Sequence, residues 1–76
     1  MTMQPIQTKV KECLFQIAIL AQNGAITADM KNRLVRQCQN GLRTKSLQDL
    51  HESVRTLSFG SPMPEVIEKL LDLSAE

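Results

Sequence analysis

The chain of 76 residues is predicted to be all-α, a single small bundle of four helices joined by short loops. In four segments, apolar residues recur at intervals of three and four, the spacing that places them on one face of a helix. Short stretches rich in Gly, Pro, Asn or Ser separate these segments, and no stretch alternates convincingly as a strand does. Short links favour antiparallel neighbours around one core, so we expect one domain over residues 1–76.

The first helix is predicted over residues 5–22, after a loose N-terminal end at residues 1–4. Pro5 suits the first turn, where its missing amide hydrogen would have no partner anyway. The dipeptide Asn23-Gly24 is a typical left-handed stop. The stripe expected to face the core comprises Ile6, Val10, Cys13, Leu14, Ile17, Leu20 and Ala21.

The second helix is predicted to begin after Thr27, its expected N-cap. Asp29 then places a carboxylate in the first turn, where the helix dipole favours it. The dipeptide Asn40-Gly41 repeats the earlier stop signal, so we expect the helix to end there and residues 42–45 to form a linker. Its inner stripe comprises Met30, Leu34 and Cys38, with Val35 on the flank.

The third helix is expected to follow a cap at Ser46, which with Asp49 forms a near-match to a capping box, and to end around residues 58–60. Ser61 can cap the fourth helix, and prolines in its first turn cost no hydrogen bond. The inner faces of these two helices comprise Leu47, Leu50, Val54 and Leu57, then Met63, Val66, Ile67, Leu70 and Leu71.

One residue near the middle of each stripe should belong to a common buried cluster. These residues are Ile17, Leu34, Leu50 and Leu70.

The composition argues against an enzyme. Cys13 and Cys38 lie on separate stripes, and we expect both to be small buried apolar groups without a disulfide framework. The single histidine, His51, lies at the margin of the third stripe, where we expect it to pack and make a local hydrogen bond. No motif links these residues to a nucleophile or a metal, so we expect no catalytic residue, no cofactor and no metal site.

The apolar run at residues 13–21 is too short to span a bilayer, so no membrane insertion is expected. The N-terminus lacks the charged-then-apolar layout of a signal peptide. A reducing, soluble compartment follows, the cytoplasm, with the nucleus as the alternative.

Phe15 and Ile19 lie one turn apart and project from nearly the opposite side of the first helix to its stripe, among Lys11 and Glu12. Two interpretations stay open: the fourth helix covers them, or they form a protein-binding patch. Phe59 has the same ambiguity, as a plug at the end of the bundle or as an anchor. If exposed, Phe15, Ile19 and Phe59 would bind another protein or a second copy of the chain.

Five basic residues lie in a block with no acidic residue between them: Lys31, Arg33, Arg36, Arg43 and Lys45. The block could contact phosphates, which gives an alternative function as a small nucleic-acid-associated helical protein. The chain has no Trp or Tyr, and neither Phe lies in the block, so stacking on single strands has little support. The competing interpretation is a solvated face, or complementary charge for an acidic partner.

The order of several short motifs resembles a known family. The segments are Asn23-Gly24-Ala25-Ile26, Met30-Lys31-x-Arg33-Leu34, Leu50-His51-x-Ser53-Val54, Phe59, Met63-Pro64-x-Val66 and Lys69-Leu70-Leu71. Together they are similar to the C-terminal helical domain shared by the steroid receptor RNA activator protein and the outer-coat subunit of coat protein complex II. The resemblance implies an all-α bundle that acts through protein contacts, without a catalytic site.

From these observations we expect a non-catalytic helical protein–protein interaction module, part of a coat, scaffold or regulatory assembly, for example in protein transport. Its partner would be another protein or a second copy of the chain, and the nucleic-acid interpretation is the alternative. A bundle that self-associates as an oligomer through the first helix is a third possibility.

Overall fold

The computed structural model describes residues 5–75, so the predicted loose end at residues 1–4 lies outside the described residues. The described part of the chain contains four helices and no strand. The predicted all-α, four-helix class is confirmed. The helices are α1 (Ile6–Gln22), α2 (Ala28–Thr44), α3 (Gln48–Leu57) and α4 (Pro64–Ser74).

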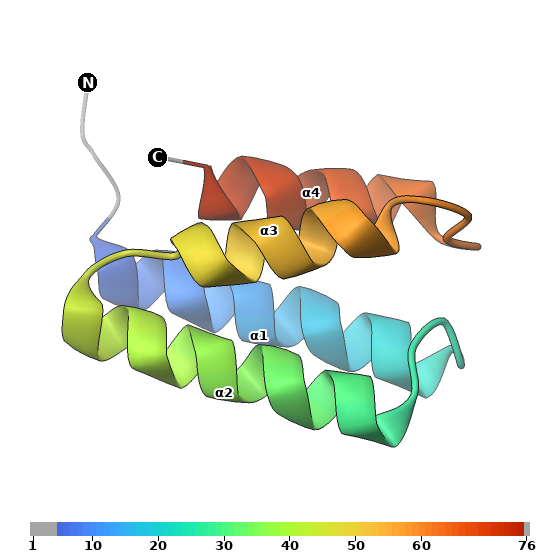
Figure 1. Ribbon diagram of the computed structural model, residues 1–76, viewed down its shortest axis with the longest axis horizontal. Coiled ribbons are helices and arrows are strands. Elements are labelled where there is room, and N and C mark those ends of the chain that lie inside the picture. Colours follow the sequence, from blue (N-terminus) through green and yellow to red (C-terminus); the bar gives the residue numbers. More distant parts are fainter. Residues whose placement is uncertain (1–4, 76) are drawn as a thin grey trace.

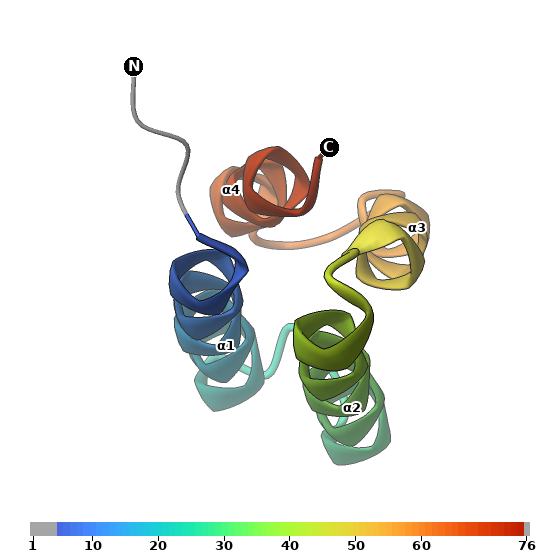
Figure 2. The same cartoon turned by 90° about the vertical axis from the view of Figure 1, so that its left-hand side faces the viewer.

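Each helix packs against two others. Helix α1 contacts α2 and α4, and α3 contacts the same two helices. Successive helices run in opposite directions, and the α1–α2 and α3–α4 loops lie at the same end of the bundle (Figure 1). Seen end-on, the helices occupy four corners, with α1 diagonal to α3 and α2 diagonal to α4 (Figure 2). Each helix therefore turns one face to the core and the opposite face outward.

Helix α1 ends where the sequence predicts. Gly24 has a φ of 71°, in the left-handed region. Its amide donates to the Ala21 carbonyl at 3.2 Å, and the Ala25 amide donates to the Leu20 carbonyl at 2.9 Å. This pair of bonds is the Schellman motif, which satisfies carbonyls that a helix end would otherwise leave open.

Helix α2 begins as predicted, because the Thr27 side chain accepts a hydrogen bond from the Met30 amide at 3.1 Å. Its predicted end at Asn40-Gly41 is wrong. The helix continues to Thr44, and Lys45 takes the left-handed conformation with a φ of 60°. The predicted linker at residues 42–45 is thus mostly helical.

Gly41 has a packing role in place of the predicted stop. The residue is buried, and a Cβ atom there would lie 2.9 Å from the Ser46 carbonyl oxygen and would overlap the Leu47 side chain. The absence of a side chain allows the chain to fold back tightly from α2 into α3. Glycine is therefore required here for close approach of two backbone segments, and not for a positive φ as at Gly24.

The N-cap residues of α3 and α4 do not cap their helices through a side-chain hydrogen bond. Helix α3 begins at Gln48, one residue later than a cap at Ser46 implies, because Leu47 takes the cap position with its side chain buried in the core. The Ser46 hydroxyl accepts from the Gln48 amide at 3.4 Å. At α4, the Ser61 hydroxyl accepts from the Met63 amide at 3.2 Å, just before the first helical residue, a proline.

The core is one cluster contributed by all four helices. The four residues predicted to share it are fully buried within it, so that prediction is confirmed. Its members are Val10, Cys13, Ile17, Leu20, Leu34, Cys38, Leu47, Leu50, Val54, Ile67 and Leu70.

Candidate interaction surface

The outer face of α1 carries an exposed aromatic residue. The Phe15 side chain is 65% exposed. Ile19, one turn further along, is partly buried, and among the described residues it belongs neither to the core nor to the apolar side chains packed against it. Because α2 and α4 flank α1 and α3 lies diagonally opposite, no helix within residues 5–75 covers this face. Of the two open interpretations, coverage of Phe15 by the fourth helix is therefore wrong.

Phe15 also forms one wall of a hollow between α1 and α4. The hollow has a volume of about 360 Å³. Its charged side chains are Glu12 from α1, and Lys69 and Asp72 from α4. The remaining lining residues are Gln16 and Leu73. This side of Phe15 therefore carries more negative than positive charge.

A second hollow, which the sequence interpretation missed, lies between α1 and α2. It has a volume of about 290 Å³ and is lined by Gln7, Thr8, Val10, Lys11 and Leu14 of α1 and Leu42 of α2. Leu42 is 40% exposed. Its position could have been found from the sequence, because Leu42 lies four residues after Cys38 and seven after Val35, on the continuation of the α2 stripe. Assigning it to a linker concealed this spacing.

Phe59 belongs to a different part of the molecule. It is 86% exposed and lies in the α3–α4 loop at one end of the bundle, whereas Phe15 lies mid-way along α1. Residues 62–66, which come shortly after Phe59 in the chain, line a hollow of about 270 Å³. Phe59 is therefore not a plug, and the structure does not join it to the Phe15 face.

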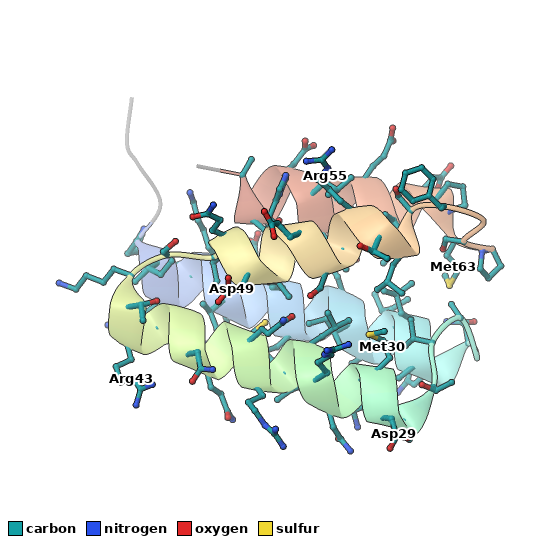
Figure 3. All side chains as sticks on the ribbon, viewed as in Figure 1. Asp29, Met30, Arg43, Asp49, Arg55 and Met63 are labelled. Carbon is teal, nitrogen blue, oxygen red and sulfur yellow. The ribbon has the colours of Figure 1, made fainter. Side chains whose placement is uncertain are left out.

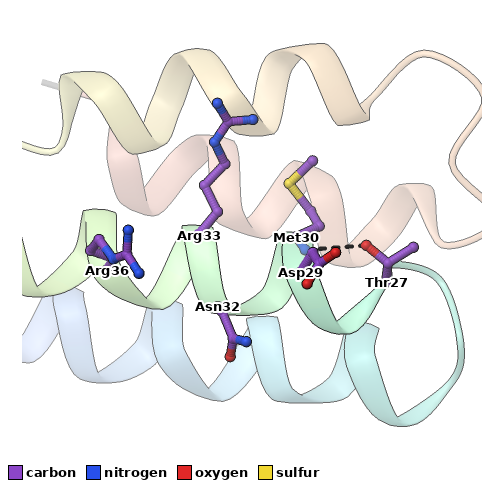
Figure 4. A pocket seen from close by; sticks show the side chains of 6 residues that line it. All are labelled: Thr27, Asp29, Met30, Asn32, Arg33 and Arg36. Carbon is purple, nitrogen blue, oxygen red and sulfur yellow. Dashed lines mark hydrogen bonds between the residues drawn. The ribbon is translucent and has the colours of Figure 1, made fainter.

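Arg33 and Arg36 line a hollow of about 470 Å³ on α2 (Figure 4). Asp29 lines the same hollow, one turn before Arg33. An acid and a base four residues apart on a helix attract each other, so part of the positive charge is offset locally. Sequence order concealed this, because Asp29 precedes the block but shares its face.

The other three residues of the basic block are also exposed. Arg43 projects from the end of α2 opposite Asp29 (Figure 3). Lys45 follows α2 as its left-handed cap, and Lys31 lies near the N-terminal end of the helix. The block is thus spread along the length of α2 and does not converge on one point.

Cys13 and Cys38 are fully buried, unpaired thiols. Burial raises the pKa of Cys13 to about 11, with the nearby Glu12 carboxylate adding to the rise and Lys9 opposing it. Burial, and then proximity to Cys13, raises the pKa of Cys38 to about 12. Both thiols therefore stay protonated and apolar at neutral pH, as the sequence predicts.

His51 makes a longer-range contact than predicted. Its Nδ1 atom lies 2.9 Å from the Ser74 hydroxyl, so the hydrogen bond joins α3 to α4 and is not local. The Ser74 hydroxyl also lies 2.7 Å from the Leu70 carbonyl; when it donates there, the His51 tautomer with its proton on Nδ1 is the donor to Ser74. Ser74 is buried, and together with His51, Gln48 and Ala75 it lines a hollow of about 220 Å³ between α3 and the end of α4.

Within residues 5–75, no group of three His, Cys, Asp or Glu side chains is arranged to hold a metal ion. None of the helices in that range has the length and apolar character needed to cross a membrane. Comparison with protein-family models, curated proteins and solved structures finds no match to the chain.

Proposed function

We propose that the protein is a non-catalytic protein–protein interaction module that docks a partner through the outer face of α1. The observation that carries this proposal is Phe15, 65% exposed at the centre of a helix face that no other helix covers. The resemblance stated above agrees with such a role in a coat, scaffold or regulatory assembly. Within this proposal the compartment is the cytoplasm, with the nucleus as the alternative.

Most of the affinity of an interface comes from a few residues, and large aromatic side chains surrounded by contacts that exclude water are prominent among them. Phe15 has a neighbouring apolar residue, Ile19, and lines one hollow, and Lys11, one turn earlier on α1, lines a second. It can therefore be desolvated by a partner without rearrangement of the core.

Nucleic-acid binding through the basic block is the second candidate function. Arg33 and Arg36 share one hollow, which favours it, but Asp29 shares that hollow too. Replacing both arginines by Gln would weaken phosphate contacts and flatten their dependence on salt. Unchanged binding to a mixed-sequence RNA or DNA fragment would exclude this candidate.

The main test replaces Phe15 by Ser and uses Phe59→Ser as the matched control, since both side chains are exposed. Proteins crosslinked to the wild-type chain in cell extract are identified, purified and titrated against the three forms by calorimetry. We expect Phe15→Ser to weaken the purified complex by about a hundredfold, and Phe59→Ser to weaken it much less.

Melting of each variant is recorded in parallel. Because the Phe15 side chain is outside the core, we expect Phe15→Ser to melt within a few degrees of wild type. A purified partner that binds Phe15→Ser and wild type equally would exclude this face as the docking site. Loss of cooperative unfolding in Phe15→Ser would assign Phe15 to the fold.

A further inference from the structure

The hollow between α1 and α2 begins one helical turn from Phe15 on α1. Lys11 lines the hollow and lies one turn before Phe15 on α1. Residues four apart on a helix are surface neighbours, so Phe15, which does not line the hollow itself, is next on the α1 surface to a residue that does. Leu42 supplies exposed apolar surface on the α2 side. We call this combined area, from Phe15 across the hollow to Leu42, the α1–α2 seam.

The charges around the seam have one sign. Among the described residues that line the hollow, Lys11 alone is charged. Arg43 follows Leu42 directly and is exposed. Lys31, also exposed, lies eleven residues before Leu42, which brings it back to nearly the same side of α2 after three turns. The hollow on the other side of Phe15 differs, because Glu12 and Asp72 line it.

From this charge pattern we propose that the partner element is an amphipathic helix with acidic flanks, seated along the α1–α2 seam. The inference rests on the proposed function and specifies the chemistry of its partner. Apolar side chains of the partner enter the hollow against Leu14 and Leu42, and its carboxylates face Lys11, Lys31 and Arg43. This is recognition of a helix in a groove, with anchors three or four residues apart.

The geometry also fixes the length and polarity of the partner helix. Lys31 and Leu42 are separated by about 16 Å along α2, so a partner helix of about three turns that begins over the hollow reaches Lys31. Its acidic residues lie on the α2 side and above Lys11 of α1. The side that passes over Phe15 toward Glu12 is neutral or basic, because carboxylates there would be repelled.

The experiment is a selection from a display library of randomised helical peptides about 14 residues long, on the immobilised wild-type chain. We expect enriched peptides to have apolar residues at helical spacing and an excess of Asp and Glu over Lys and Arg. Selected peptides, resynthesised, should bind Leu42→Ser and Lys11→Glu at least about tenfold more weakly than wild type. Lys69→Glu, a charge reversal on the other side of Phe15, is the matched control and should bind normally.

The remaining outcomes overturn the inference in distinguishable ways. Peptides weakened by Phe15→Ser but by neither Leu42→Ser nor Lys11→Glu would leave the proposed function standing and remove the seam. If the selected peptides bind Phe15→Ser, Leu42→Ser and Lys11→Glu as tightly as wild type, or if no peptide is enriched, both the seam and the proposed function are excluded. A concentration-dependent mass of the chain alone, abolished by Leu42→Ser, would make a second copy the occupant. Binding to phosphatidylserine vesicles that is lost in Leu42→Ser or Lys11→Glu would make a membrane surface the occupant of the seam.

Discussion

The dipeptides Asn23-Gly24 and Asn40-Gly41 have the same residues in the same order but lie in different surroundings. Gly24 is exposed, has a positive φ, and would have no atom within 4 Å of an added Cβ. Gly41 is buried within α2 against the start of α3. The dipeptide thus limits which backbone conformations and close contacts are available, and tertiary packing decides which of them occurs.

The largest expected effect comes from Leu47, the side chain that packs where Gly41 has none. Leu47 is buried, and truncation to Ala should cost about 2–5 kcal/mol in the free energy of unfolding. Urea denaturation followed by circular dichroism measures this loss. A change under about 0.5 kcal/mol would mean that Leu47 is not part of the core.

Gly41→Ala should come next, at about 1–3 kcal/mol of destabilisation, because the new methyl group overlaps Leu47 and approaches the Ser46 carbonyl. The higher helix propensity of Ala opposes this by about 1 kcal/mol. In a double-mutant cycle with Leu47→Ala the cost should shrink, since the truncation makes room for the methyl group. Additive effects would contradict direct packing between the two positions.

Gly24→Ala should cost about 1 kcal/mol, for a different reason. The added methyl group has space, but a left-handed φ is unfavourable for Ala. Gly24→Asn should therefore restore part of the loss, since Asn tolerates this conformation, whereas Gly41→Asn should cost more than Gly41→Ala. If Gly24→Asn and Gly24→Ala melt at the same temperature, backbone strain is not the cause.

Near pH 9, titration of the cysteines should have the smallest effect. Folding raises the thiol pKa values from the ordinary 9.0 to about 11 for Cys13 and about 12 for Cys38. The unfolded chain therefore loses these protons first, so stability is constant well below pH 9 and falls as pH rises through 9 toward 11. Cys38 lies one turn before Gly41 and contributes to this loss. No cysteine lies within one turn of Gly24 in the sequence. Cys38→Ala should flatten the decline in measured unfolding free energy.

Features that depend on residues close in sequence were predictable. Thr27 caps α2 through the amide three residues later, and Gly24 closes α1 through bonds that span five residues or fewer. The core stripes follow from helical spacing alone, so Ile17 and Leu70 were placed correctly. These predictions needed no knowledge of which helices are neighbours.

Features that depend on contacts between helices were missed. The burial of Gly41 depends on the α2–α3 turn, and the His51–Ser74 bond joins residues 23 positions apart. The exposure of Phe15 was undecided because periodicity shows that two faces of α1 are apolar but not which neighbours cover them. The hollow beside Leu42 was missed for the same reason, since it exists only where α1 and α2 meet.

The two buried thiols also allow the rate of transient opening of the native bundle to be measured. Alkylating reagents attack thiolates, and burial keeps both sulfur atoms protonated and out of contact with solvent. Iodoacetamide can therefore reach them only during transient separation of the helices, so the rate of carbamidomethylation counts openings of the native bundle. Because Cys13 and Cys38 lie in different helices, comparing their rates would distinguish loosening of one helix from opening of the whole molecule.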